Sequence, residues 1–265
     1  MKKNQKTLIW TFCTEGSPPS YLLGTMHVSD AKAFAFEAIM KAKILECKAF
    51  ATEFDLDQAD ANAVNAAMLL PEGVTLSQIL PPKLYEKTQR VLLKTTGADI
   101  SNFNHFKPLI FTNIFVGSVL SNDRLQALDD TLWQFARENG RILRGIETFE
   151  EQIEILKKLP LDGQIKGLRD LISHFSATRR ELLRTTRWFE QAEIEKLYKA
   201  ARRSMKGNRR LMIFDRNQKM AQRITALVAE NGSVCAAIGA GHLWGERGVL
   251  NLLRRQGFVV KPVSV

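Results

Sequence analysis

The chain has 265 residues, of which 45% are hydrophobic and 25% charged, with a formal net charge of +10. These proportions are ordinary for a globular protein, and the length is sufficient to bury a sizeable core. No apolar run reaches the ~20 residues that a membrane span needs, so an integral membrane protein is excluded.

The sequence also disfavours secretion and disulfide bonding. The apolar stretch near the N-terminus is shorter than the ~7–15 residues of a signal sequence, no small-residue cleavage site follows, and the segment fits a first β-strand better. The three cysteines, Cys13, Cys47 and Cys235, lack C-x-x-C spacing, which fits a reducing compartment. We therefore expect a cytoplasmic protein.

Short apolar runs bounded by turn residues predict strands, and apolar residues at helical spacing predict helices. In chain order, we expect strands at 7–12 and 20–24, a helix at 34–45, a strand at 48–54, helices at 57–70, 81–97, 106–120 and 128–140, a strand at 141–146, a helix at 148–159, an almost wholly helical stretch at 161–231, a strand at 233–239, a helix at 246–257 and a last strand at 258–263.

The predicted strands lie mostly at the two ends of the chain, with helices between them. This arrangement indicates an α/β fold whose central mixed sheet is built from N- and C-terminal segments and flanked by helices. We expect a single domain over residues 1–265, with a large helical insertion at roughly 57–125 and 160–231.

Much of the positive charge lies in one segment, residues 179–223, which holds 14 Lys and Arg against 5 Asp and Glu. Such a segment can bind nucleic acid, an anionic membrane or an acidic substrate. It can also be the solvated face of helices, with acid–base pairs along it. We favour the second interpretation, because no nucleic-acid-binding motif accompanies the charge.

Two of the four histidines follow a predicted strand in the same pattern, G-x-x-H. They are His27, after Gly24-Thr25-Met26, and His242, after Gly239-Ala240-Gly241. Ligands of open α/β sheets bind at the carboxyl ends of strands, where glycine lets the chain turn sharply and brings backbone close to a ligand. A single histidine in this setting is usually a hydrogen-bonded turn residue, but two matching ones favour a shared metal site.

A metal site with two histidines needs a third ligand, commonly a carboxylate, and an open position for water. Glu53 is the best candidate, because it ends an apolar strand, where a carboxylate is costly unless it serves a ligand. An ordinary acid at a strand end is the alternative. A dinucleotide fingerprint fails at Trp244, and no P-loop or G-x-S-x-G motif is present.

Five stretches of the chain resemble one known family along its whole length. YLLGTMHV, ATEFD, LDDTLWQFARENGRILRGIETFEEQ, FDRNQKMAQRI and AAIGAGHLWGERGVLNLLRRQGFVVKP are similar to the TraB/PrgY/GumN family, which is related to the TIKI metalloproteases and more remotely to erythromycin-esterase and ChaN-like proteins. The resemblance implies an α/β core with helical additions and a metal-dependent hydrolase site.

Carried onto this chain, the resemblance gives roles to further residues. Arg216 and Asn217 match an R-N pair of the family, preceded here by Asp215 where the family often has Glu, and Glu147 matches an E-T-x-x-x-Q stretch that ends at Gln152. Arg216 would hold an anionic group or stabilise developing charge, with an ion pair to a surface acid as the alternative. Glu147 and Asn217 would belong to the substrate-binding side of the site. Glu147 would contact a histidine from behind or cap the strand exit, and Asn217 would orient Arg216 or cap a helix turn.

Together these observations predict a divalent ion, Zn, Mn, Co or Fe, held by His27, His242 and Glu53, with Gly24, Thr25, Gly239 and Gly241 lining the substrate side. Glu53 is either a ligand or the general base. The resemblance makes a peptide or another small acyl compound the expected substrate. The rival interpretation is a non-catalytic peptide-binding or regulatory protein that uses the same cleft. The sequence leaves the oligomeric state open.

Overall fold

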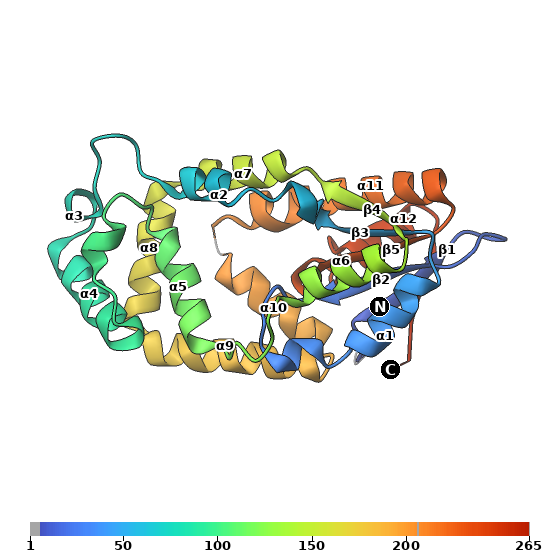
Figure 1. Cartoon of the computed structure of the whole chain (residues 1–265), viewed down its shortest axis with the longest axis horizontal. Helices are drawn as coiled ribbons and strands as arrows, with labels where there is room; N and C mark the ends of the chain where they lie inside the picture. The colour runs from blue at the N-terminus through green and yellow to red at the C-terminus, as the bar shows by residue number, and fades with distance from the viewer. Residues whose placement is uncertain (1–5, 206, 265) are drawn as a thin grey trace. The chain divides into compact units, whose positions relative to one another are not determined.

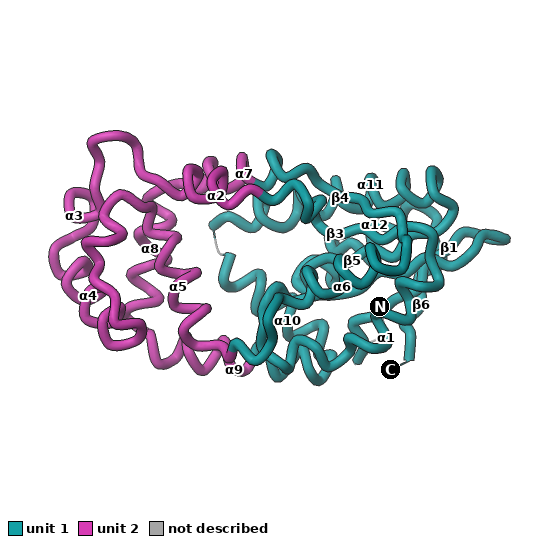
Figure 2. Tube along the Cα trace, viewed as in Figure 1, with its two compact units in different colours: residues 1–59, 122–152, 185–265 teal, residues 60–121, 153–184 magenta. Residues whose placement is uncertain are grey.

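The structure is a computed structural model that describes residues 6–205 and 207–264. The chain forms two compact units (Figure 2). The first unit, which holds the sheet, consists of residues 1–59, 122–152 and 185–265, and the second of residues 60–121 and 153–184. That the whole chain acts as one domain stays a prediction.

The first unit contains one six-stranded sheet, which confirms the predicted α/β class. Its strands are β1 (Ile9–Cys13), β2 (Ser20–Thr25), β3 (Ala49–Phe54), β4 (Ile142–Glu147), β5 (Val234–Gly239) and β6 (Val259–Pro262). Their order across the sheet is β4-β3-β5-β2-β1-β6, and Figure 1 labels the first five strands of the chain. Strands from the two ends of the chain are therefore neighbours, as the sequence predicted.

The sheet is mixed. The pairs β2–β5, β5–β3 and β3–β4 are parallel, whereas β1 is antiparallel to both β2 and β6. The antiparallel β1–β2 pair is the predicted hairpin. Four neighbouring strands consequently end at the same edge of the sheet, and in open α/β sheets this carboxyl edge is where ligands bind.

Both faces of the sheet are covered by helices, which explains why the central strands are apolar throughout instead of alternating. Every residue of β2 is buried, and every residue of β5 except Gly239 is buried too. On one side α1 packs with α6, and on the other α11 packs with α12 (Figure 1). The helices of this unit are η1 (Ala31–Phe34), α1 (Glu37–Leu45), η2 (Leu56–Gln58), α6 (Leu128–Glu138), α10 (Ile194–Ser204), the π-helical η4 (Arg210–Phe214), α11 (Asp215–Asn231), η5 (Ala240–His242) and α12 (Val249–Arg255).

The second unit is helical and has its own apolar core, which includes Leu92, Phe111, Phe115 and Leu168. Its helices are α2 (Ala61–Met68), α3 (Leu76–Ile79), α4 (Pro82–Thr96), η3 (Ile100–Phe103), α5 (Leu109–Val119) and α8 (Leu161–Ser173). Two more, α7 (Phe149–Lys158) and α9 (Phe175–Glu190), contribute residues to both units. The one-turn helix α3 was not predicted, because four residues carry too little periodicity to identify.

Each helix within residues 6–205 and 207–264 is too short or too polar to cross a membrane.

Candidate active site at the carboxyl edge of the sheet

The two G-x-x-H turns are neighbours in space. His27 lies two residues beyond the end of β2, and His242 lies in η5, directly after β5. The register pairs Thr25 with Gly239, so the turns leave adjacent parallel strands side by side. They pack tightly, since a Cβ added to Gly24 would lie 2.6 Å from Leu243 Cδ1 and 3.4 Å from the Cα of Ala240.

His242 is held in a buried setting. Its side chain is 12% exposed, and its Nδ1 lies 2.6 Å from Asn217 Oδ1. The amide nitrogen of Asn217 donates to the carbonyls of Arg247 (2.7 Å) and His242 (3.3 Å), which fixes the amide orientation and makes its oxygen the acceptor. The Nδ1 atom of His242 therefore carries the proton and Nε2 carries the lone pair.

The charge state of His242 suits a metal ligand. Burial lowers the pKa of His242 to about 4, although the negative charge of Glu53 opposes this shift. The imidazole is consequently neutral near pH 7, which is the form that binds metal ions.

His27 is anchored by a different residue in a more open setting. Its side chain is 67% exposed, and its Nδ1 lies 3.4 Å from Oδ2 of the buried Asp129. The hydroxyl of Thr25 donates to the other oxygen of Asp129 at 2.6 Å. The carboxylate of Asp129 raises the pKa of His27. As at His242, the nitrogen that faces an oxygen atom is Nδ1, which leaves Nε2 for a ligand.

Glu53 lies on β3, next to β5. Its carboxylate contacts the end of β5 through one oxygen and Arg216 through the other. Its Oε1 accepts from the backbone N–H of Gly239 at 2.8 Å and lies 3.9 Å from Nε2 of His242. Its Oε2 accepts from Arg216 Nη2 at 2.6 Å. Burial by itself would raise the pKa of Glu53, but the charge of Arg216, with smaller effects of His242 and the Gly239 hydrogen bond, lowers it to about 2. Glu53 is therefore ionised.

Arg216 connects Glu53 to a second, fully buried carboxylate. Its Nε donates to the two oxygens of Glu147 at 3.1 and 3.0 Å, and its Nη2 bonds both Glu147 and Glu53. Gln152 Nε2 also donates to Glu147, at 2.9 Å. The two carboxylates raise the pKa of Arg216 despite its burial. The preceding acid, Asp215, lies outside this network and pairs with Arg210 at 3.5 Å.

The donor chemistry of these residues fits a divalent metal ion. Each imidazole has an oxygen atom beside its Nδ1. Asn217 Oδ1 is hydrogen-bonded to Nδ1 of His242, and Asp129 Oδ2 lies 3.4 Å from Nδ1 of His27. An oxygen acceptor at this nitrogen orients metal-binding histidines in other proteins. Among the described residues, the buried Oδ2 atom of Asp129 has no hydrogen bond. In the described part of the chain, no three His, Cys, Asp or Glu side chains are gathered as a complete metal site.

The structure adds one residue that the sequence did not single out, Asp129. It lies in the first turn of α6 and is 6% exposed. A signal was present in the sequence, because Asp129 precedes Leu132 and Trp133 by three and four residues and so shares the apolar face of its helix. A carboxylate on the buried face of a helix is costly unless it has a partner.

Comparison with known proteins identifies the family of the chain. The TraB/PrgY/gumN family model matches residues 8–262. Curated relatives include Metalloprotease TIKI1 of Danio rerio, 24% identical over 96% of this chain and 63% of its own length, and the Metalloprotease TIKI homolog of Nematostella vectensis, 23% identical over 99% and 68%. Metalloprotease TIKI1 of Homo sapiens is 24% identical over 96% and 61%. No solved structure matches the chain.

The chain spans less than two thirds of the Danio rerio and Homo sapiens relatives. The matched region nevertheless runs from the residue before β1 to the last residue of β6, so it includes the whole sheet and the residues at its carboxyl edge. This chain belongs to the TraB/PrgY/gumN family.

Proposed function

We propose that the chain is a metal-dependent hydrolase that cleaves peptide bonds. One observation carries the proposal: two imidazoles that follow adjacent parallel strands each have an oxygen atom beside Nδ1, and the ionised Glu53 lies beside one of them. The relatives named metalloproteases support a metal cofactor and a peptide substrate.

His27 and His242 would hold the ion through Nε2, with Glu53 as the third ligand. When bound, a divalent ion, Zn, Mn, Co or Fe, polarises the scissile carbonyl and makes water a stronger nucleophile. A general base works best when its pKa is near the working pH. The low pKa of Glu53, about 2, therefore favours the ligand role over the base role.

The surrounding residues hold these three side chains in place. Asn217 holds the ring of His242 and Asp129 lies beside that of His27. Arg216 holds the carboxylate of Glu53, Glu147 holds Arg216, and Gln152 holds Glu147. The Nε and Nη2 atoms of Arg216 donate to Glu147 and Glu53. We therefore assign Arg216 the role of positioning Glu53. In the reaction, water adds to the peptide carbonyl carbon, the C–N bond breaks, and a proton from the water passes to the leaving amine.

The test combines metal analysis with turnover. The protein is purified, stripped and reloaded separately with each of the four metals. Bound metal is measured by elemental analysis and cleavage of a peptide library by mass spectrometry. We expect about one ion per chain in the wild-type protein, and loss of both metal and turnover in His27→Ala and His242→Ala. Loss of several kcal/mol of charge stabilisation corresponds to a roughly thousandfold slower reaction.

His105→Ala is the matched control, because His105 is exposed and belongs to the second unit; it should keep both properties. Glu53→Gln separates the two roles of Glu53. Loss of metal identifies a ligand, and retained metal with lost turnover identifies a base. Metal that survives in both the His27 and His242 variants contradicts the proposal. Peptide that binds without being cleaved in the metal-loaded protein identifies a capture protein instead of an enzyme.

A further inference from the structure

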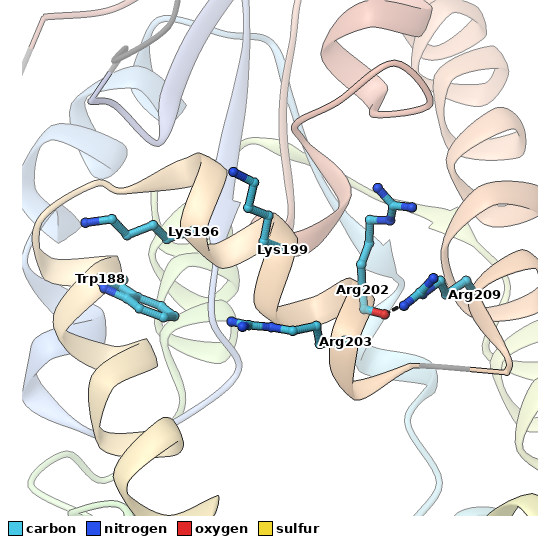
Figure 3. Close-up of a pocket in the computed structure, with 6 residues that line it drawn as sticks. All are labelled: Trp188, Lys196, Lys199, Arg202, Arg203 and Arg209. Atoms are coloured by element: carbon cyan, nitrogen blue, oxygen red, sulfur yellow. Dashed lines mark hydrogen bonds between the residues drawn. The ribbon is translucent and has the colours of Figure 1, made fainter.

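A second site candidate lies in the first unit and is lined by a different set of residues. It is a pocket of about 320 Å³ lined by Trp188, Lys196, Lys199, Arg202, Arg203 and Arg209 (Figure 3). Five of these six residues are cationic, and no acidic residue in the described part of the chain lines the pocket. Organic ligands occupy pockets of ~300–1,000 Å³, so this volume suits a small molecule better than a bare ion.

The helix α10 has two faces with different partners. Ile194, Leu197 and Tyr198 are buried in the unit, and Ala201 lies so close to the His242 turn that a Cβ on Gly241 would approach its Cβ to 2.7 Å. Lys196, Lys199 and Arg203 recur three and four residues apart and therefore share another face, which lines the pocket. The three cations span about 10 Å along the helix, given a rise of 1.5 Å per residue.

Like charges at this spacing repel each other, and acids pair with the two lysines of the row. Glu193 lies 3.2 Å from Lys196 but is shared with Lys6, and Glu195 lies 2.6 Å from Lys199. These pairs agree with the acid–base pairing predicted for the cationic segment. Exposed ion pairs are worth about 0–1 kcal/mol, so an anion that carries several charges can displace them.

The two ends of the pocket differ in chemistry. In Figure 3, the guanidinium of Arg203 points toward the indole of Trp188, which comes from α9. At the other end, Arg209 Nε donates to the backbone carbonyl of Arg202 at 2.6 Å, and Arg202 stacks on Tyr198 and Phe214. The Nε atom of Arg202 is buried without a hydrogen-bond partner. A buried N–H without an acceptor is costly, and a bound anion would supply one.

We propose that this pocket binds a small organic molecule with at least two phosphate groups. The row of cations would contact successive phosphates, because lysine and arginine both bind phosphate and arginine does so through paired N–H groups. The indole of Trp188 would contact the planar or apolar part of the same molecule. This site is independent of the proposed hydrolase activity.

The test is calorimetric titration of metal-stripped protein at low salt with ATP, pyrophosphate and citrate, so that no metal centre can recruit the phosphates. The pocket variant is Lys196→Gln with Lys199→Gln, both exposed residues. Its matched control is Lys83→Gln with Lys94→Gln, which removes the same charge from exposed positions of α4. Thermal unfolding verifies that both variants are folded.

We expect ATP to bind the wild-type and control proteins equally and to bind the pocket variant at least tenfold more weakly, which corresponds to about 1.4 kcal/mol. Trp188→Leu should weaken ATP binding but leave pyrophosphate binding unchanged. Equal affinity of the pocket variant and the wild-type protein for ATP would overturn the proposal. Three other results would also overturn it. Citrate could bind as tightly as ATP, ATP could fail to show saturable binding, or Trp188→Leu could leave the affinity for ATP unchanged.

Discussion

The two histidine turns share one sequence pattern but lie in opposite surroundings. His242 is 12% exposed and its pKa is lowered, whereas His27 is 67% exposed and its pKa is raised. The buried ring is anchored by a neutral amide, Asn217, and the exposed ring by a carboxylate, Asp129. Both anchoring residues are themselves buried, so the difference in pKa follows from the burial of the His242 ring and from the charge of Asp129 beside His27. The repeated G-x-x-H motif therefore fixes where each histidine ring lies in the fold but not its charge state.

The anchors give the largest expected effect. Residues that orient metal-binding histidines contribute ~10–100-fold to metal affinity. We expect Asn217→Ala to lower the affinity about 100-fold, because it also leaves the carbonyls of His242 and Arg247 without their donor. Asp129→Ala should lower it only about 10-fold, because the exposed ring of His27 retains water as a partner. Competition with a fluorescent chelator measures both values.

The control is Asp130→Ala, which removes a neighbouring acid from the same first turn of α6. It should change the affinity less than threefold. An effect of Asp129→Ala equal to or larger than that of Asn217→Ala would break the contrast between the two anchors.

The glycines of the two motifs give a smaller effect, on folding stability. A Cβ on Gly24 would lie 2.6 Å from Cδ1 of the fully buried Leu243, whereas a Cβ on Gly239 would lie 3.1 Å from Oε1 of Glu53. Overpacking a core costs about 1–3 kcal/mol. We expect Gly24→Ala to lower the free energy of unfolding by this amount and Gly239→Ala to lower it by less. Urea unfolding measures both changes.

Gly239→Ala should instead act on the site. The added methyl group meets the carboxylate that Gly239 holds through its N–H, so metal affinity should fall while most of the stability remains. If Gly239→Ala destabilises the protein more than Gly24→Ala does, the two turns are not packed as described.

The smallest expected effect is the pH response of the metal-free protein. The pKa of His242 is about 4, below the ordinary 6.5, so the folded state loses stability as the pH falls from 6.5 toward 4, where the unfolded chain takes up a proton first. The pKa of His27 is raised, so its contribution is present below pH 6.5 and is lost as the pH rises through the folded value. NMR titration of the ring signals, assigned with His27→Ala and His242→Ala, measures the pKa of each histidine in the folded protein.

The expected result is one titration midpoint above 6.5, for His27, and another near 4, for His242. Coincident midpoints would show that the two rings have the same surroundings, in conflict with their different exposure.

The sequence located the elements of the sheet closely, for a physical reason. Burial on both faces makes a strand an uninterrupted apolar run, as in Val234–Gly239, which was predicted at 233–239. The helix predicted at 81–97 became α4, Pro82–Thr96, since Pro82 starts it and Gly97, with φ of 73°, ends it. The stretch predicted as helical through 161–231 was divided by the structure into α8, α9, α10, η4 and α11, because periodicity shows that a segment is helical but not where it bends.

For the candidate site, sequence reasoning and resemblance named His27, His242, Glu53, Arg216 and Asn217, and the structure brings all five to one unit and one sheet edge. Whether they bind metal stays a prediction. Asp129 was not named, because its partner Thr25 is 104 positions away in the chain and no local spacing relates them.

By itself, the amino-acid sequence determined the α/β class, the approximate strands and helices, and the paired turns with their histidines, because apolar periodicity and glycine placement act over a few residues. Only the tertiary structure decided the strand order, the partner of each imidazole and the ion pairs of Arg216. Hydrogen bonds and burial depend on which distant segments meet, and the same folding that joins β2 to β5 makes one histidine a buried neutral base and leaves the other exposed beside a carboxylate.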